Sequence, residues 1–187
     1  MTYLENIQQF TPANEQEMTE KEVILSFIHQ YESNVLLRDN PIAHITSSGF
    51  LMNRDLDKVL LIHHNIRNAW AWTGGHADGD SDLLYVAVKE AVEETGAVTI
   101  SPLSSEIASL DILPVFGHWR KGKFINAHLH LSIAYILICD EQEHLRPQLS
   151  ENTDVAWFSA GYFTKDHFDP SDVYLYNKLI AKARLLR

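Results

Sequence analysis

The most informative part of this sequence runs from Gly75 to Ala97 and reads GHADGDSDLLYVAVKEAVEETGA. Together with Gly74, its first residues predict a tight polar loop, because glycines and aspartates adopt positive φ and form side-chain turn bonds. The apolar pattern that follows predicts a helix from about residue 82 to 95, with Gly96 as its left-handed cap. A glycine-rich loop is therefore expected to lead directly into a helix.

Three glutamates lie close together on this expected helix. Glu90, Glu93 and Glu94 stand at i, i+3 and i+4 and so project from one face. No run of lysines or arginines on the same turns offsets their charge, so the cluster costs stability unless a cation neutralises it. Carboxylate oxygens are preferred ligands of Mg²⁺. A solvated acidic face is the alternative, and the preceding glycine loop favours metal binding. The apolar residues that would dock the helix on a sheet are Leu84, Ala87, Val88 and Ala91.

This stretch resembles the Nudix box, G-x5-E-x7-R-E-U-x-E-E-x-G-U, in which U is apolar. Gly75 begins the motif, Lys89 to Ala97 complete it, and every spacing is kept. Two positions depart from the pattern, since Ser81 replaces the usual Glu and Lys89 the usual Arg. The glutamates that bind metal in the family are all present.

The resemblance implies a hydrolase that cleaves a phosphoanhydride (pyrophosphate) bond in a nucleoside diphosphate derivative, with Mg²⁺ or Mn²⁺ as cofactor. It implies that Glu90, Glu93 and Glu94 are catalytic metal ligands and that the backbone carbonyl of Gly74 is another. The family usually adds an acidic residue from a loop outside the box, and Glu151 is our choice. Its rivals are Glu141, Glu143 and Asp154.

The two departures from the box are interpreted as linked. With Ser81 in place of a carboxylate, a forked guanidinium is no longer required, so Lys89 can serve as a point charge. Asp80 or Asp82 is expected to take the contact with it. The group that acts on the attacking water must then lie elsewhere, at Glu94 or Glu151. A weakened or inactive relative is the alternative.

Histidines near the box are candidates for contacts with the substrate. His64 ends an expected strand, His76 lies in the glycine loop, and His128 and His130 share one face of a strand. We expect phosphate contacts from His64, His76 and His130, and a structural role for His63. A softer metal such as Zn²⁺ is less favoured, because no cysteine joins the histidines and their spacings are not those of a closed zinc site.

Two further substrate residues are predicted. Trp72 could stack on a base or pack beneath the loop. Arg120 belongs to a basic patch with Lys121 and Lys123, which would hold the leaving phosphate or form a solvated turn.

The flanking sequence predicts an α/β fold. Residues 1–40 have a helical pattern from about Thr19 and are expected to form a helical extension, packed on the main domain or on a second copy in a homodimer. Residues 41–187 are expected to form a Nudix hydrolase domain, an α/β/α sandwich with a mixed sheet. Its expected elements are a hairpin over 45–52 and 58–63, strands near 110–116, 127–139 and 155–158, and a closing helix near 172–186.

Composition limits the class of protein. The chain has 187 residues and a formal net charge of −10, which argues against binding to nucleic acid or anionic membranes. No apolar run approaches the roughly 20 residues of a membrane helix, and the single cysteine, Cys139, fits a buried thiol in a reducing compartment. We therefore expect a cytoplasmic enzyme whose partner is a small nucleotide-like molecule.

Two other functions fit the sequence less well than hydrolysis. An enzyme like isopentenyl-diphosphate isomerase needs a cysteine in the glycine loop, whereas this chain has Gly74-Gly75-His76 there. A non-catalytic nucleotide sensor of the same fold tends to lose the glutamates that this chain keeps. Both alternatives are less favoured than the hydrolase.

Overall fold

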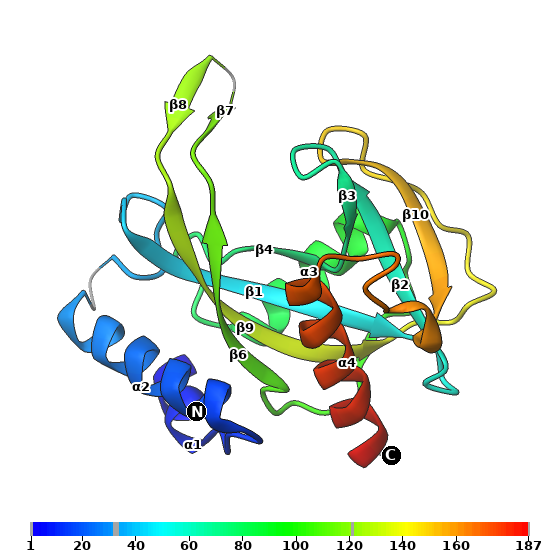
Figure 1. Ribbon diagram of the computed structural model, residues 1–187, viewed down its shortest axis with the longest axis horizontal. Helices are drawn as coiled ribbons and strands as arrows, with labels where there is room; N and C mark the ends of the chain where they lie inside the picture. Colours follow the sequence, from blue (N-terminus) through cyan, green and yellow to red (C-terminus); the bar gives the residue numbers. More distant parts are fainter. Residues whose placement is uncertain (1, 32–33, 121, 187) are drawn as a thin grey trace.

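The computed structural model describes residues 2–31, 34–120 and 122–186, and a mixed β-sheet forms its centre (Figure 1). The central strands, β1 (Ala43–Met52) and β9 (His128–Ile138), run parallel from Ala43 opposite Leu129 to Met52 opposite Ile138. All other pairings in this sheet are antiparallel, and its strands follow the order β10-β2-β1-β9-β5. The remaining members are β3, which pairs with β2, β4, which pairs with β1, and β6, which pairs with β9. The expected α/β fold with a mixed sheet is confirmed.

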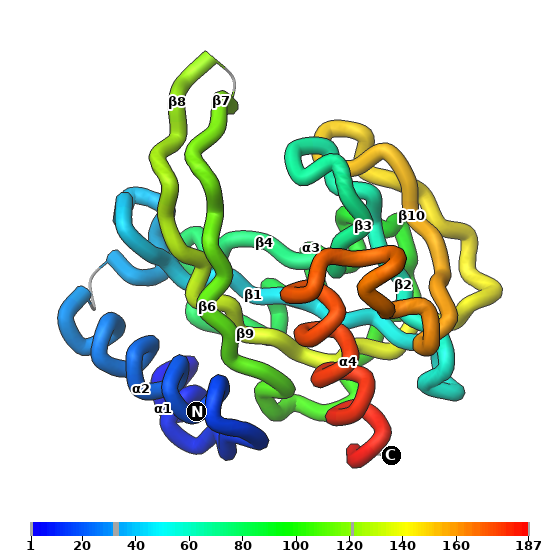
Figure 2. Tube along the Cα trace, in the orientation of Figure 1, coloured from blue at the N-terminus to red at the C-terminus, as the bar shows by residue number. Residues whose placement is uncertain are grey.

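The other strands of the sheet are β2 (Lys58–His64), β3 (Ala69–Ala71), β4 (Thr73–His76), β5 (Ser101–Pro102), β6 (Ser109–Val115) and β10 (Asn152–Ser159). A separate hairpin of β7 (His118–Arg120) and β8 (Lys123–Ile125) projects away from the body of the molecule (Figure 2). The helices are α1 (Tyr3–Gln9), α2 (Glu15–Gln30), α3 (Leu83–Thr95) and α4 (Pro170–Leu185), with a short 3₁₀ turn, η1, over Ala160–Tyr162. Not one of the helices described is both long enough and apolar enough to cross a bilayer.

The predicted hairpin between β1 and β2 is present. Its turn is fixed by the Asn53 side-chain oxygen, which accepts hydrogen bonds from the backbone N–H groups of Asp57 and Lys58. Every residue of β1 is buried, because the strand lies between α3 on one face of the sheet and α4 on the other (Figure 1). Alternate side chains therefore enter different cores, Leu51 with α3 and Phe50 with α4.

Helix α3 has the predicted limits. The Asp82 side chain accepts a hydrogen bond from the N–H of Tyr85 and caps the start, and Gly96 ends the helix at φ 69°. Its expected docking face is largely correct, since Ala87 and Ala91 are buried in the core and Leu84 and Val88 pack at its edge.

Two expected boundaries were wrong. Helix α2 begins at Glu15 rather than near Thr19, because the Asn14 side chain accepts a hydrogen bond from the N–H of Glu17 and caps an earlier turn. The glycine loop is shorter than expected, since Gly74 and Gly75 lie in β4 and pair with Ser48 and Ser47 of β1. Backbone pairing with a distant strand is not visible in local turn propensity.

The helices before residue 40 pack on the same core as α3. Ile7 of α1 and Ile24 and Ile28 of α2 are fully buried within it. A charged network reinforces this contact, in which Nζ of Lys178 on α4 lies 3.2 Å from Oε1 of Glu17 on α2 and 2.6 Å from Oδ1 of Asp111 on β6.

Candidate functional site

Glu94 is the most buried of the three glutamates of α3, with 3% of its surface exposed. Its Oε2 accepts a hydrogen bond of 3.0 Å from the backbone N–H of Gly74, so the helix is joined to β4 at this point. Burial raises the pKa of its carboxyl to about 8, and the charges of Glu90, Glu151 and Glu93 act in the same direction, while the Gly74 hydrogen bond opposes them. Without a cation nearby, this carboxyl holds its proton at neutral pH.

Glu90 lies against the second glycine of the motif. A Cβ atom at Gly75 would lie 2.3 Å from Cδ of Glu90, which is closer than two carbon atoms can approach. A side chain at this position would therefore displace the carboxyl of Glu90. Burial raises the pKa of Glu90, and Lys89 partly offsets the effect. Glu93, one turn away, is exposed.

Lys89 does not contact the aspartates beside Ser81, so that expectation was wrong. Its Nζ lies 3.5 Å from Oε1 of Glu90 and 3.9 Å from Oε1 of Glu93, in an exposed setting. The two aspartates serve the loop instead, because Asp82 caps α3 and Asp80 accepts a hydrogen bond from the N–H of Asp82. Lys89 is thus a weak counter-charge within the acidic cluster.

Glu151 is brought to the glutamates of α3 by its neighbour in the chain. The buried side chain of Asn152 donates a hydrogen bond of 3.0 Å to the backbone carbonyl of Glu94, while the backbone carbonyl of Glu151 accepts one from the N–H of Asn65. Burial is the main cause that raises the pKa of Glu90 and of Glu94, and the charge of Glu151 adds to it, so Glu151 lies within electrostatic range of both.

The three rivals of Glu151 are occupied elsewhere. Glu141 pairs with Lys58 at 2.8 Å, Glu143 accepts hydrogen bonds from the backbone of Thr99, and Asp154 bonds to its neighbour Val155.

Arg38 is a site residue that sequence reasoning missed. Its Nε donates a hydrogen bond of 2.6 Å to Asp78 in the loop after β4, and the charges of Glu90 and Glu151 help to raise its pKa. It belongs to the segment expected to be only a helical extension. The sequence carries no local signal for it, because the contact joins residues 40 positions apart.

Four histidine rings, those of His44, His76, His128 and His130, lie together on the face of the sheet away from α3, and no signal in the sequence indicated that His44 belongs to this group. His44 on β1 lies opposite His130 on β9, and His76 ends β4 one residue after the Gly75 that contacts Glu90. One ring nitrogen from each of these three lies within 4.8 Å of the others. Burial lowers the pKa of His76 to about 3, and the positive charge of Arg38 adds to the effect. Burial likewise lowers the pKa of His130 to about 2, and His76 adds to the effect. Both rings are therefore neutral at physiological pH.

The other candidate substrate residues are placed differently. The Nδ1 of His64 accepts hydrogen bonds from the N–H groups of Ile66 and Arg67. Burial lowers the pKa of His64, and the negative charge of Glu151 opposes this shift. Arg120 is exposed on the projecting hairpin and lies within electrostatic range of His64.

Trp72 is largely buried and packs against Phe50 and Tyr176 in the core that α4 covers. Of the basic patch around Arg120, Lys121 lies outside the described residues.

Cys139 lies far along the sheet from the glycine motif. It is buried and follows the end of β9, where its N–H bonds to the carbonyl of Met52, whereas the histidines lie at the start of that strand. The structure thus provides no cysteine beside Gly74 for isomerase chemistry.

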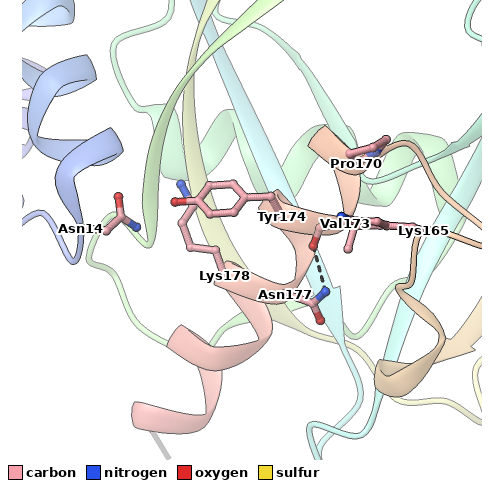
Figure 3. Close-up of a pocket in the computed structure, with 7 residues that line it drawn as sticks. All are labelled: Asn14, Lys165, Pro170, Val173, Tyr174, Asn177 and Lys178. Atoms are coloured by element: carbon pink, nitrogen blue, oxygen red, sulfur yellow. Dashed lines mark hydrogen bonds between the residues drawn. The ribbon is translucent and has the colours of Figure 1, made fainter.

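A hollow on the surface lies apart from all these residues. It is formed between the start of α2 and α4, where the side chain of Asn177 donates a hydrogen bond of 2.9 Å to the carbonyl of Val173 (Figure 3). The lining consists of Asn14, Lys165, Pro170, Val173, Tyr174, Asn177 and Lys178. It includes none of the candidate site residues, and its lining contains neither an acidic side chain nor a histidine.

Comparison with known proteins gives one family. A search of curated protein sequences finds no match. Among solved structures, a hydrolase of the NUDIX family from Clostridium perfringens is similar, with 21% identity, a TM-score of 0.52, and coverage of 77% of this chain and 98% of that one. An Ap4A hydrolase from C. elegans, solved as a binary complex, has 14% identity and a TM-score of 0.51, covering 73% of this chain and 95% of that one. These similarities show the fold. The family model of the NUDIX domain matches residues 43–179, most of the chain, and the protein therefore belongs to the Nudix family.

Proposed function

We propose that this protein is a pyrophosphohydrolase that cleaves a phosphoanhydride bond in a nucleoside diphosphate derivative and depends on Mg²⁺ or Mn²⁺. Membership of the family supports a hydrolase in general. The observation that carries the finer proposal is the acidic cluster, in which the buried Glu94 is surrounded by Glu90, Glu93 and Glu151. A fold that gathers four carboxyls in this way is destabilised unless a cation joins them.

The residues present fit a hard divalent ion. Carboxylate oxygens from Glu90, Glu93, Glu94 and Glu151 and the backbone carbonyl of Gly74 are the donors that Mg²⁺ prefers. When bound, such an ion would neutralise phosphate charge and lower the pKa of a water molecule. The raised pKa of Glu94 is the expected state of this donor set when only protons compensate its charge.

Residues of the protein would accept the proton of the attacking water, orient the catalytic carboxyl and bind the phosphates. Glu94 or Glu151 would accept the proton of the attacking water, since both belong to the acidic cluster and neither is held by a lysine or arginine ion pair among the residues described. The N–H of Gly74 keeps the Glu94 carboxyl oriented. Arg38 would balance the cluster and reach the substrate's phosphates, for which a guanidinium is well suited.

Substrate binding is proposed to involve the flanking histidines and arginine. His64, His76 and His130 surround the ends of β2, β4 and β9, and Arg120 on the hairpin adds a positive charge within electrostatic range of His64 and His76. Trp72 is the least favoured of the sequence candidates, because packing against Tyr176 leaves only 9% of its surface exposed.

We further propose that residues 1–40 are a helical extension of a domain formed by residues 41–187, and that the enzyme acts in the cytoplasm. The buried isoleucines of α1 and α2 support the first statement, since they lie in the same core as α3. The buried free thiol of Cys139 supports the second.

The proposal is tested with a panel of nucleoside triphosphates, dinucleoside polyphosphates, sugar nucleotides and dinucleotide cofactors, incubated with Mg²⁺ or Mn²⁺. Release of phosphate or nucleoside monophosphate is the readout. With the best substrate, Glu151→Gln should reduce turnover by about two powers of ten, as for loss of a general base or ligand, whereas the matched control Asp154→Asn should not. Absence of metal-dependent hydrolysis across the panel would refute the proposal.

A further inference from the structure

We propose that His44, His76 and His130 form a second cation site, separate from the acidic cluster and selective for a transition metal of the Zn²⁺ class. The inference goes beyond the proposed hydrolysis and does not depend on it. It rests on the geometry of three strands and on two buried ring nitrogens.

The strand pairings bring the three rings together from distant parts of the sequence. His44 and His130 are direct partners in the parallel pair of β1 and β9, and His76 pairs with Thr46, two residues along β1 from His44. Because alternate residues of a strand share a face, all three side chains lie on the same face of the sheet. Ring centroids are separated by 4.9 Å for His44 and His76, 4.9 Å for His76 and His130, and 5.2 Å for His44 and His130.

These distances are close to those of a metal site. One nitrogen of each ring lies within 4.8 Å of the other two. A tetrahedral zinc site with Zn–N bonds of about 2.1 Å has nitrogens roughly 3.4 Å apart, so small rotations of the rings would complete it. Three protein ligands leave the fourth position open for water or for an atom of a bound molecule.

Unsatisfied nitrogens provide an independent observation. The Nε2 atoms of His44 and His130 are buried and have no hydrogen-bond partner within the described part of the chain. Buried polar atoms are nearly always paired, and each exception calls for a ligand or a water molecule. The Nδ1 of His44 lies 3.3 Å from the backbone carbonyl of Asn40, and this is the contact that orients a metal-binding histidine through its other nitrogen.

The type of ligand, rather than the surrounding charge, favours a borderline ion over Mg²⁺. Arg38 and Arg120 lie within electrostatic range of His76, and Asp78, which is paired with Arg38, opposes them. With neutral imidazoles as its only direct donors, the site offers no charge to attract a hard ion. Imidazole suits Zn²⁺, Co²⁺ and Ni²⁺, whereas Mg²⁺ selects carboxylate oxygens. The acidic cluster would therefore bind Mg²⁺, and the three histidines would bind Zn²⁺ or a similar ion.

The test uses the full-length protein with Mg²⁺ in excess, to which Zn²⁺ or Co²⁺ alone is added. Calorimetry should show one Zn²⁺ per chain, and Co²⁺ should give the visible absorption of a tetrahedral nitrogen site. His76→Gln and His130→Gln should each weaken Zn²⁺ binding by at least roughly 10- to 100-fold. That is the loss usually seen when a residue that only orients a metal ligand is replaced, and loss of a ligand itself should cost at least as much. His63→Gln is the matched control, because His63 lies on β2 and contacts Thr153 instead.

Three results would overturn the site. The first is that the wild-type protein does not bind Zn²⁺ in the presence of Mg²⁺. The second is that both histidine variants fold and bind Zn²⁺ with unchanged affinity. The third is that Glu94→Gln loses Zn²⁺ binding, which would place the ion among the carboxylates. Retention of Zn²⁺ binding by Glu94→Gln also separates this proposal from the hydrolytic one. Should a histidine variant not fold, imidazole NMR of the wild type decides, since Zn²⁺ must shift the signals of His44, His76 and His130 and leave that of His63 unchanged.

Discussion

Glu17 and Glu94 are both buried glutamates, exposed by only 1% and 3%, yet their surroundings are opposite. Oε1 of Glu17 lies 3.2 Å from Nζ of Lys178 and accepts a hydrogen bond from Ser109. Among the residues described, neither a lysine nor an arginine forms an ion pair with Glu94, and burial, together with three other carboxylates, raises its pKa. The charge of Glu17 is compensated by a lysine of the protein, whereas the carboxyl of Glu94 requires a proton or a bound cation.

The difference separates a structural charge from a functional one. Lys178 on α4 bonds to acids on α2 and β6, so its network connects three elements and specifies how they pack. The acidic cluster of α3 connects its helix to β4 through one hydrogen bond to Gly74 and otherwise repels itself. Removing a charge should therefore have opposite consequences for stability in the two regions.

The largest effect is expected from Glu94→Gln. The substitution keeps the shape of the side chain but removes a charged group from the site, so turnover with Mg²⁺ should fall by about two to four powers of ten. The free energy of unfolding of the metal-free protein at neutral pH should be unchanged or higher, because a buried glutamine is neutral without taking up a proton. Steady-state kinetics and thermal unfolding measure the two quantities, and a variant with near wild-type turnover would contradict the assignment of this glutamate.

Lys178→Met should have the next largest effect, on stability alone. It leaves Glu17 and Asp111 buried without their cation and should lower the free energy of unfolding by about 3–5 kcal/mol. Hydrolysis per folded molecule should persist, since the network lies outside the acidic cluster. Lys165→Met, at an exposed lysine, is the control and should change stability by less than about 0.5 kcal/mol.

A triple variant, Glu17→Gln, Asp111→Asn and Lys178→Met, sharpens that comparison. Removing all the charges should recover part of the loss, because no unpaired ion then remains buried. If the single and triple variants were equally stable, the network would contribute packing rather than charge compensation.

The effect of pH in the absence of metal is smaller than that of Lys178→Met for each single pH unit. The pKa of Glu94 is raised to about 8 in the folded state, above its unfolded value of 4.5, so folding retains a proton that the unfolded chain releases. Stability should be greatest below the unfolded pKa and fall as pH rises through the folded pKa, by no more than roughly 1.4 kcal/mol per pH unit. Denaturant titrations at several pH values measure this slope. Glu94→Gln and saturating Mg²⁺ should each flatten it, and a slope identical in the variant would exclude Glu94 as its source.

The smallest effect is expected from Ser81→Ala. Ser81 is exposed in the loop before α3, and Lys89 is directed to Glu90 and Glu93 instead. Turnover should stay within about twofold of wild type, as is usual for a surface substitution away from the chemistry. A loss as large as that of Glu94→Gln would mean that the catalytic group has been placed wrongly.

Features that depend on spacing along the chain could be predicted from the local sequence. Helix α3, its end at Gly96 and the shared face of its glutamates all follow from contacts within four residues along the chain. The cap at Asp82 was missed, because Asp80 or Asp82 was expected to contact Lys89. The hairpin of β1 and β2 was likewise predictable, because its turn is fixed by Asn53 within five residues.

Tertiary structure alone decided which distant residues join the site. Arg38 contacts Asp78, Asn152 anchors Glu151 beside Glu94, and His44 meets His130 across β1 and β9. These contacts span 40 to 86 residues and depend on strand register, where a slip of one residue would turn every side chain to the other face. Short strands such as β7 escaped prediction for the same reason, since pairing rather than local propensity makes them strands.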